Sequence, residues 1–168
     1  MTNQASKPVN LNTLVKPTYT ISSTDWVNNT TGKTVTITYP SNGTHTFTAT
    51  GTFTVVEGTA TSSDGTYTVT GNTVKLKFTT NGSITAYVSD GTNTVESSYT
   101  ISKIDTSKPS VDLATSVTTN SVTATATCAD SETGISKIEF SKDGNTWDNN
   151  GTNPTKTYSK LTSGSYTI

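Results

Sequence analysis

Threonine occupies every second position over long stretches of this chain. Forty-two of the 168 residues are threonine, and the alternation is plain in TVTIT (34–38), HTFTAT (45–50) and TYTVT (66–70). Successive side chains of a β-strand point to opposite faces, so this spacing places apolar residues on one face and threonine on the other. Threonine is β-branched and favours the extended backbone even on a solvated face. The pattern predicts an all-β protein of antiparallel sheets.

The charge composition of the chain argues against nucleic acid as a partner. Hydrophobic residues make up 29% and charged residues 14% of the chain, and the net charge is −1. All 11 basic residues are lysine, and arginine, which binds phosphate and carboxylate in bidentate fashion, is absent. This balance argues against nucleic-acid binding, although a coding sequence rich in A and T would also favour lysine over arginine.

Groups that perform catalysis are scarce. The chain has one histidine and one cysteine, and no phosphate-binding glycine loop, HExxH or GxSxG motif. Cys128 lies on the apolar side of SVTATATC and is predicted to be a small buried hydrophobe. His45 belongs to the other half of the chain, so no nucleophile–base pair can be assembled around it. We expect no enzymatic activity, no cofactor and no metal.

The chain divides into an N-terminal arm, 1–16, and two β-domains, 17–105 and 106–168. Strands of the first domain are expected at 18–22, 33–39, 44–57, 65–70, 73–79, 83–89 and 94–103. The run 44–57 is unusually long, and Gly51 offers a bend or bulge in its middle. Turns are expected at 41–43, 64–65, 71–72, 81–82 and 90–91, where Gly, Asn and Asp tolerate the backbone of tight hairpins.

The second domain follows the junction DTSKP (105–109) and has the same character. Its expected strands are VDLATSV, SVTATATC, ISKIEFS, KTYSKL and SGSYTI. The last of these reaches Ile168, so the domain is expected to be incomplete at its C-terminal end. An open sheet edge pairs readily with other chains. We therefore expect either that the chain continues or that a partner supplies the missing strand.

The arm contains the candidate partner-binding residues. It lacks strand periodicity but carries apolar side chains at Val9, Leu11, Leu14 and Val15. These residues are predicted to anchor the chain to a partner, and the alternative is a frayed terminus. The arm has no apolar run of the kind found in signal peptides. No stretch of the chain approaches the roughly 20 apolar residues of a membrane span.

Several segments resemble a known repeat. ETGISKIEFSKDGNTW (132–147), followed by KTYSKLTSGSYTI (156–168), resembles the immunoglobulin-like (Ig-like) repeat of Gram-positive surface proteins and their phages, with Phe140 where that repeat has tyrosine. ISKIDTSKPSV (101–111) is similar to its interdomain linker. TYTISSTDWVNNTTGKTVTITY (18–39) and NGSITAYVSDGTNTVESSYTISKID (81–105) resemble the outer strands of a sister repeat. The resemblance implies tandem Ig-like β-sandwiches, the second incomplete at the C-terminus.

Three further features of the sequence have a functional interpretation and a simpler one. Asp130, Glu132 and the acidic and amide residues of 143–150 gather oxygen atoms that suit calcium, but they also suit hairpin turns. Some Gram-positive Ig-like domains carry a Lys–Asn cross-link, which needs an inward lysine, whereas Lys75 and Lys77 are predicted to face outward and Lys33 to lie in a turn. The residues Trp26 and Trp147 are candidate glycan-stacking or interface groups, but are expected to cover the ends of the cores.

The resemblance implies a non-enzymatic structural role. Modules of this kind are displayed outside cells, whereas this chain starts at Met1 with no secretion segment. We therefore expect a phage virion protein: a capsid decoration, head fibre or tail-associated protein. The arm would bind other virion proteins or copies of itself, and the modules would project and touch host-surface glycans weakly. The alternative is a fragment of an extracellular adhesin or stalk from a Gram-positive cell surface.

Overall fold

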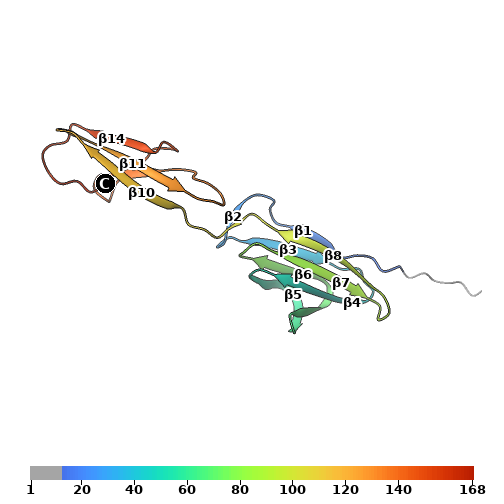
Figure 1. Cartoon of the computed structure of the whole chain (residues 1–168). Coiled ribbons are helices and arrows are strands. Elements are labelled where there is room, and N and C mark those ends of the chain that lie inside the picture. Colours follow the sequence, from blue (N-terminus) through green and yellow to red (C-terminus); the bar gives the residue numbers. More distant parts are fainter. Residues whose placement is uncertain (1–12) are drawn as a thin grey trace, which may run out of the picture. The chain divides into compact units, whose positions relative to one another are not determined.

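The computed structural model describes residues 13–168, and these residues form only strands, turns and loops (Figure 1). The strand pairs of the two larger sheets and of the small C-terminal hairpin are all antiparallel, so the expected all-β class is confirmed. The chain forms two compact units that divide between Ile104 and Asp105. Within the described residues, nothing forms a helix able to cross a membrane.

The first unit contains one sheet of seven strands and a short strand pair. The strands are β1 (Thr18–Ile21), β2 (Val27–Asn28), β3 (Lys33–Thr38), β4 (Thr44–Thr50), β5 (Phe53–Ser63), β6 (Thr66–Phe78), β7 (Gly82–Ser89), β8 (Thr94–Ile101) and β9 (Ile104–Asp105). The sheet runs in the order β1-β3-β6-β4-β7-β8, and β5 pairs with β6. β2 pairs with β9.

The long strand β6 joins two groups of strands. Its first half pairs with β4, with Val69 opposite His45, and its second half pairs with β3, with Leu76 opposite Val35. β5 follows the other edge of β6 through both halves. The sheet therefore divides at β6 into a group β1-β3-β6-β5 and a group β4-β7-β8.

Alternating apolar side chains from both groups form one core. The buried set is Val35, Ile37, Tyr39, Phe47, Val69, Val74, Leu76, Phe78, Ile84, Ala86, Val88, Ile101 and Ile104. Aromatic rings add to it, since Phe47 stacks on Tyr67 at 4.7 Å and Phe53 meets Phe78 at 5.3 Å between ring centroids. The intervening threonines 36, 46 and 85 remain at least partly exposed. The alternation predicted from the sequence thus separates core from surface.

Two features of the first unit differ from the sequence prediction. The run 44–57 does not form one strand, because β4 ends at Thr50 and β5 begins at Phe53 after a turn at Gly51. Gly51 has a φ of 87°, and a Cβ there would lie 2.6 Å from the carbonyl oxygen of Asn81. The expected turn at 71–72 is also wrong. β6 continues through Gly71, whose φ of 93° bends the strand where its partner changes from β4 to β3.

The second unit contains a three-stranded sheet and a small hairpin. Its strands are β10 (Ser110–Val117), β11 (Ser121–Ala129), β12 (Glu139–Ser141), β13 (Trp147–Asn149) and β14 (Thr155–Ser159). The sheet has the order β10-β11-β14, and β12 pairs with β13. The core is small, with Ala124, Ala126, Phe140 and Tyr158 buried and Cys128 partly buried against them. The expected strand at 163–168 is not formed.

Candidate partner-binding surface

The structure describes part of the predicted anchor. Val9 and Leu11 lie outside the described residues, whereas Leu14 packs against the core of the first unit and Val15 is exposed. The Ser97 hydroxyl of β8 donates to the Pro17 carbonyl at 2.7 Å. The end of the arm is therefore held against the first unit, and Val15 is the one described anchor residue whose side chain is free to meet a partner.

Tyr19 fastens β1 to the strands across the core. Its hydroxyl accepts the Ala86 N–H at 3.1 Å and donates to the Ser97 carbonyl at 2.5 Å. Ala86 and Ser97 face each other in the β7–β8 pair, so one side chain bridges both strands. Burial raises the pKa of Tyr19, and the hydroxyl therefore remains protonated and able to donate.

The second unit exposes the apolar face of β10. Val111, Leu113 and Val117 are 66%, 45% and 73% exposed. They lie on the same side of the sheet as the buried residues of β11, because Leu113 is opposite Ala126 and Val117 is opposite Val122. A groove of about 530 Å³ opens on this side. Its apolar lining consists of Leu113, Val117, Val122, Leu161, Tyr166 and Ile168.

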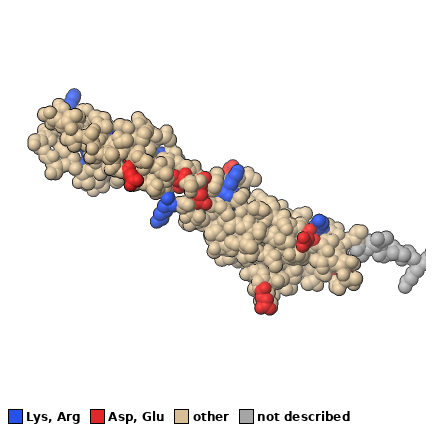
Figure 2. All heavy atoms as spheres, viewed as in Figure 1, with Lys and Arg blue, Asp and Glu red and all other residues tan. Residues whose placement is uncertain are grey.

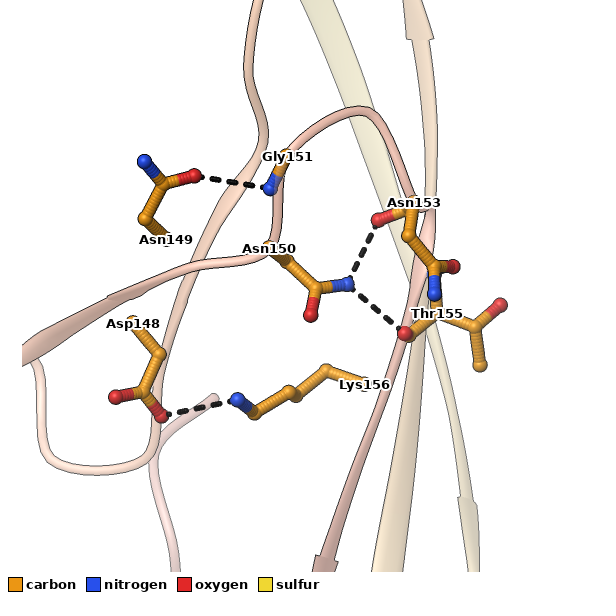
Figure 3. A network of polar contacts seen from close by, with 7 residues as sticks. All are labelled: Asp148, Asn149, Asn150, Gly151, Asn153, Thr155 and Lys156. Carbon is orange, nitrogen blue, oxygen red and sulfur yellow. Dashed lines mark hydrogen bonds and ion pairs between the residues drawn. The ribbon is translucent and has the colours of Figure 1, made fainter.

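A polar network closes the other end of the second unit (Figure 3). Lys156 of β14 forms an ion pair with Asp148 of β13 at 3.4 Å, which links the sheet to the hairpin. The Asn150 side-chain amide donates to the carbonyls of Asn153 and Thr155, at 2.8 Å and 3.0 Å, and so fixes the loop between them. The ion pair and the Asn150 hydrogen bonds therefore hold β13 beside β14.

The acidic loops act as turn caps. The Asp130 carboxylate accepts the N–H groups of Glu132 and Thr133, and the Asp143 carboxylate accepts those of Asn145 and Thr146. The Thr146 N–H is the main cause that lowers the pKa of Asp143 to about 2. Within residues 13–168 no three His, Cys, Asp or Glu side chains gather as metal ligands would. The hydrogen bonds that Asp130 and Asp143 accept show that both carboxylates cap turns.

The linker is clamped by Glu132, a contact that the sequence reasoning missed. The Glu132 carboxylate accepts the N–H groups of Thr106 and Ser107 at 2.8 Å and 2.9 Å. The Thr106 N–H is the main cause that lowers the pKa of Glu132 to about 2. The Asp105 carboxylate also accepts the Thr133 hydroxyl at 2.7 Å. The sequence gives no sign of this contact, because Glu132 follows Thr106 by 26 residues and is brought back to it by the β10–β11 hairpin.

Two basic side chains of the first unit are buried. Lys33 is the first residue of β3 and only 2% exposed, so its predicted place in a turn is wrong. Burial is the main cause that lowers its pKa, and nearby Lys103 acts in the same direction. His45 Nδ1 lies 2.7 Å from the Gly71 carbonyl, which requires a proton on Nδ1, and the ring stacks on Tyr39 at 4.7 Å. Both side chains are parts of the packed core region.

Neither tryptophan covers a core as predicted. Trp26 precedes β2 and Trp147 begins β13, and their side chains are 44% and 60% exposed. Trp147 is opposite Ser141 of β12 on a hairpin of only three residues per strand, too small to bury an indole ring. Uncharged side chains make up most of the surface visible in Figure 2.

Comparisons with family models, with curated proteins and with solved structures find no match to this chain. Its function is therefore inferred from its own geometry. The most distinctive surface is the exposed apolar face and edge of β10 in the second unit. Strands of this kind bind partners by extending a sheet.

Proposed function

We propose that the two units are Ig-like sandwiches in tandem. The observation that carries this proposal is the strand order. β1-β3-β6-β5 corresponds to the ABED sheet of an immunoglobulin domain, and β4-β7-β8 corresponds to the CFG sheet. The contact between β4 and β6 is an added bridge between the two sheets.

The second unit follows the same order over its first strands. β10, β11 and β14 correspond to β1, β3 and β6, and β12 corresponds to β4. Counterparts of β7 and β8, which complete the core of the first unit, are missing from the described residues 105–168. Val111, Leu113 and Val117 are exposed because they face the space that β7 and β8 fill in the first unit, where the second unit has no counterpart among the described residues.

We further propose that the protein is a non-enzymatic structural component of a phage virion. The resemblance of 132–147 and 156–168 to repeats of Gram-positive surface and phage proteins supports display outside the cell. The weakly charged, threonine-rich composition suits a spacer or decoration. The arm is proposed as the anchor, through Val9 and Leu11 as well as the exposed Val15.

The first experiment compares two fractions from the natural source. Phage particles purified on a density gradient and washed cell walls are each analysed by mass spectrometry for peptides of this chain. A virion protein is enriched in the particle fraction with constant stoichiometry to the major capsid protein. Enrichment in the cell-wall fraction would instead support the adhesin or stalk and overturn the virion assignment.

The anchor is tested with the same particles. The chain carrying Val9→Asn and Leu11→Asn is added to particles that lack the protein, beside a control carrying Asn10→Ala and Asn12→Ala. We expect the first variant to lose particle binding and the control to retain it. Equal binding of both variants would show that these apolar side chains do not anchor the protein.

A further inference from the structure

β10 differs from the other long edge strands in having nothing on its free side. Its eight residues are all exposed and pair only with β11 within the described chain. β5, also at an edge, has two register shifts and a Glu57–Lys75 ion pair. β8 has a contact with a segment outside its sheet, since the Ser97 hydroxyl donates to the Pro17 carbonyl. Bulges, charges and covering groups are the usual protections of a sheet edge.

The backbone groups on the free side of β10 can be assigned. The Thr118 N–H donates to the Ser121 carbonyl at 2.9 Å, so this pair closes the β10–β11 hairpin. Hydrogen-bonded pairs alternate in an antiparallel ladder, so the even-numbered residues of β10 bond to β11. The N–H and C=O groups of Val111, Leu113, Thr115 and Val117 therefore point away from the sheet and are free to bond to another strand.

The sequence of β10 is complementary to itself in the antiparallel direction. If two copies meet with Ala114 opposite Ala114, then Val111 faces Val117 of the other copy and Leu113 faces Thr115. These are the residues whose backbone groups point outward, so the pair forms about eight interstrand hydrogen bonds. The single charged residue, Asp112, faces Ser116 and meets no like charge.

We propose that β10 pairs with β10 of a second copy of this chain about a two-fold axis at Ala114. The pairing joins two β10-β11-β14 sheets into one continuous six-stranded sheet and makes the interface isologous. It also brings the apolar side chains of Val111 and Val117 from the two copies together. This inference concerns the isolated protein and does not depend on whether the protein is displayed on a virion or on a cell.

The first test measures mass in solution. Sedimentation equilibrium over a wide concentration range is expected to show twice the chain mass of 17.6 kDa. Thr115→Pro removes an outward N–H without touching a bond to β11, so the mass is expected to fall to that of one chain. Thr115→Val keeps the N–H and is expected to remain a dimer. Circular dichroism verifies that both variants are folded.

The second test reads the register directly. Facing residues of a non-hydrogen-bonded antiparallel pair have Cα atoms about 4.5 Å apart, within the roughly 4.4–6.8 Å span of a disulfide. In a Cys128→Ala background, Ala114→Cys is expected to form a covalent dimer on mild oxidation. The matched control Ser116→Cys faces Asp112 of the other copy and is expected to stay uncross-linked.

The two tests can overturn the proposal independently. A wild-type mass of one chain at every concentration would exclude the pairing. A dimer that survives Thr115→Pro would place the interface elsewhere. Equal cross-linking of the 114 and 116 variants, or of neither, would exclude this register even if the protein is dimeric. Because all measurements use the purified chain, these failures are distinct from failure of the proposed virion role.

Discussion

At the scale of single residues, Tyr19 contributes more to the stability of the first unit than its position near the start of β1 suggests. One hydroxyl satisfies the Ala86 N–H and the Ser97 carbonyl. Tyr19→Phe leaves both backbone groups without this partner in a half-buried place, so we expect a loss of about 1–3 kcal/mol in the free energy of unfolding. Urea denaturation of the first unit measures this loss.

Tyr99→Phe is the matched control for that prediction. The Tyr99 ring lies 5.4 Å from the Tyr19 ring and is also half-buried, so the substitution tests for a general effect of removing a hydroxyl there. We expect it to change the free energy of unfolding by less than Tyr19→Phe does. If both variants lose the same free energy of unfolding, the two backbone contacts of the Tyr19 hydroxyl add nothing specific to stability.

Glu132 gives the second unit a defined dependence on pH. Its folded pKa of about 2 lies below the ordinary 4.5, so the unfolded chain binds more protons between these values. The stabilisation is complete above about pH 4.5 and is lost as the pH falls towards 2. We expect Glu132→Gln to lower the unfolding midpoint of the second unit at neutral pH, and the difference from wild type to narrow below pH 4.5.

Glu96→Gln provides the comparison for the pH measurement. Glu96 is an exposed residue of β8 in the first unit. This substitution is expected to leave the unfolding midpoint of the second unit unchanged across the same pH series. A constant difference between Glu132→Gln and wild type at every pH would mean that the clamp does not act through the ionised carboxylate.

At the scale of elements, the turn at Gly51 decides where the chain passes from β4 to β5. Gly51 and Gly91 have nearly the same φ, 87° and 90°, but only Gly51 has a neighbour, the Asn81 carbonyl, where a Cβ would be. Gly91→Ala should therefore reduce the free energy of unfolding by only about 1–2 kcal/mol, the cost of a side chain at a left-handed backbone position. Gly51→Ala should cost more, because the Asn81 carbonyl must also move. Equal thermal shifts for the two variants would contradict this.

The same elements show how far the sequence predicts the fold. Alternation of threonine with apolar residues predicted the strands and the buried face of β3, β6 and β7, because that signal is local. It did not predict the turn at Gly51 or the passage of β6 through Gly71. A glycine with positive φ suits a turn, a bend or a bulge equally, and the choice depends on which strand lies opposite.

The candidate surface was predicted only in part. The sequence indicated an open edge in the second unit, but it did not indicate that every residue of β10 would be exposed. Burial depends on the strands that face a side chain, which local patterns do not reveal. For the same reason Lys33 was placed in a turn although it is buried, and Trp147 was placed at a core although its hairpin is too short to cover it.

At the scale of the whole molecule, the two units have cores of unequal size. Thirteen residues form the buried apolar cluster of the first unit, against four in the second. Stability grows with the apolar surface buried, and a small domain that buries little is marginal. The apolar face of β10 adds little to the second core, because its side chains are exposed.

We therefore expect two separate unfolding transitions, with the second unit unfolding at the lower temperature. Hydrogen exchange followed by mass spectrometry assigns each transition to its own peptides. Phe140→Ala should lower the midpoint temperature of only the first transition, and Phe47→Ala that of only the later one. Each substitution should reduce the free energy of unfolding of its own unit by about 3–5 kcal/mol, the usual cost of losing a buried phenylalanine. If either substitution moved both transitions together, the units would form one cooperative domain, and the separation of their cores at Ile104 would carry no energetic meaning.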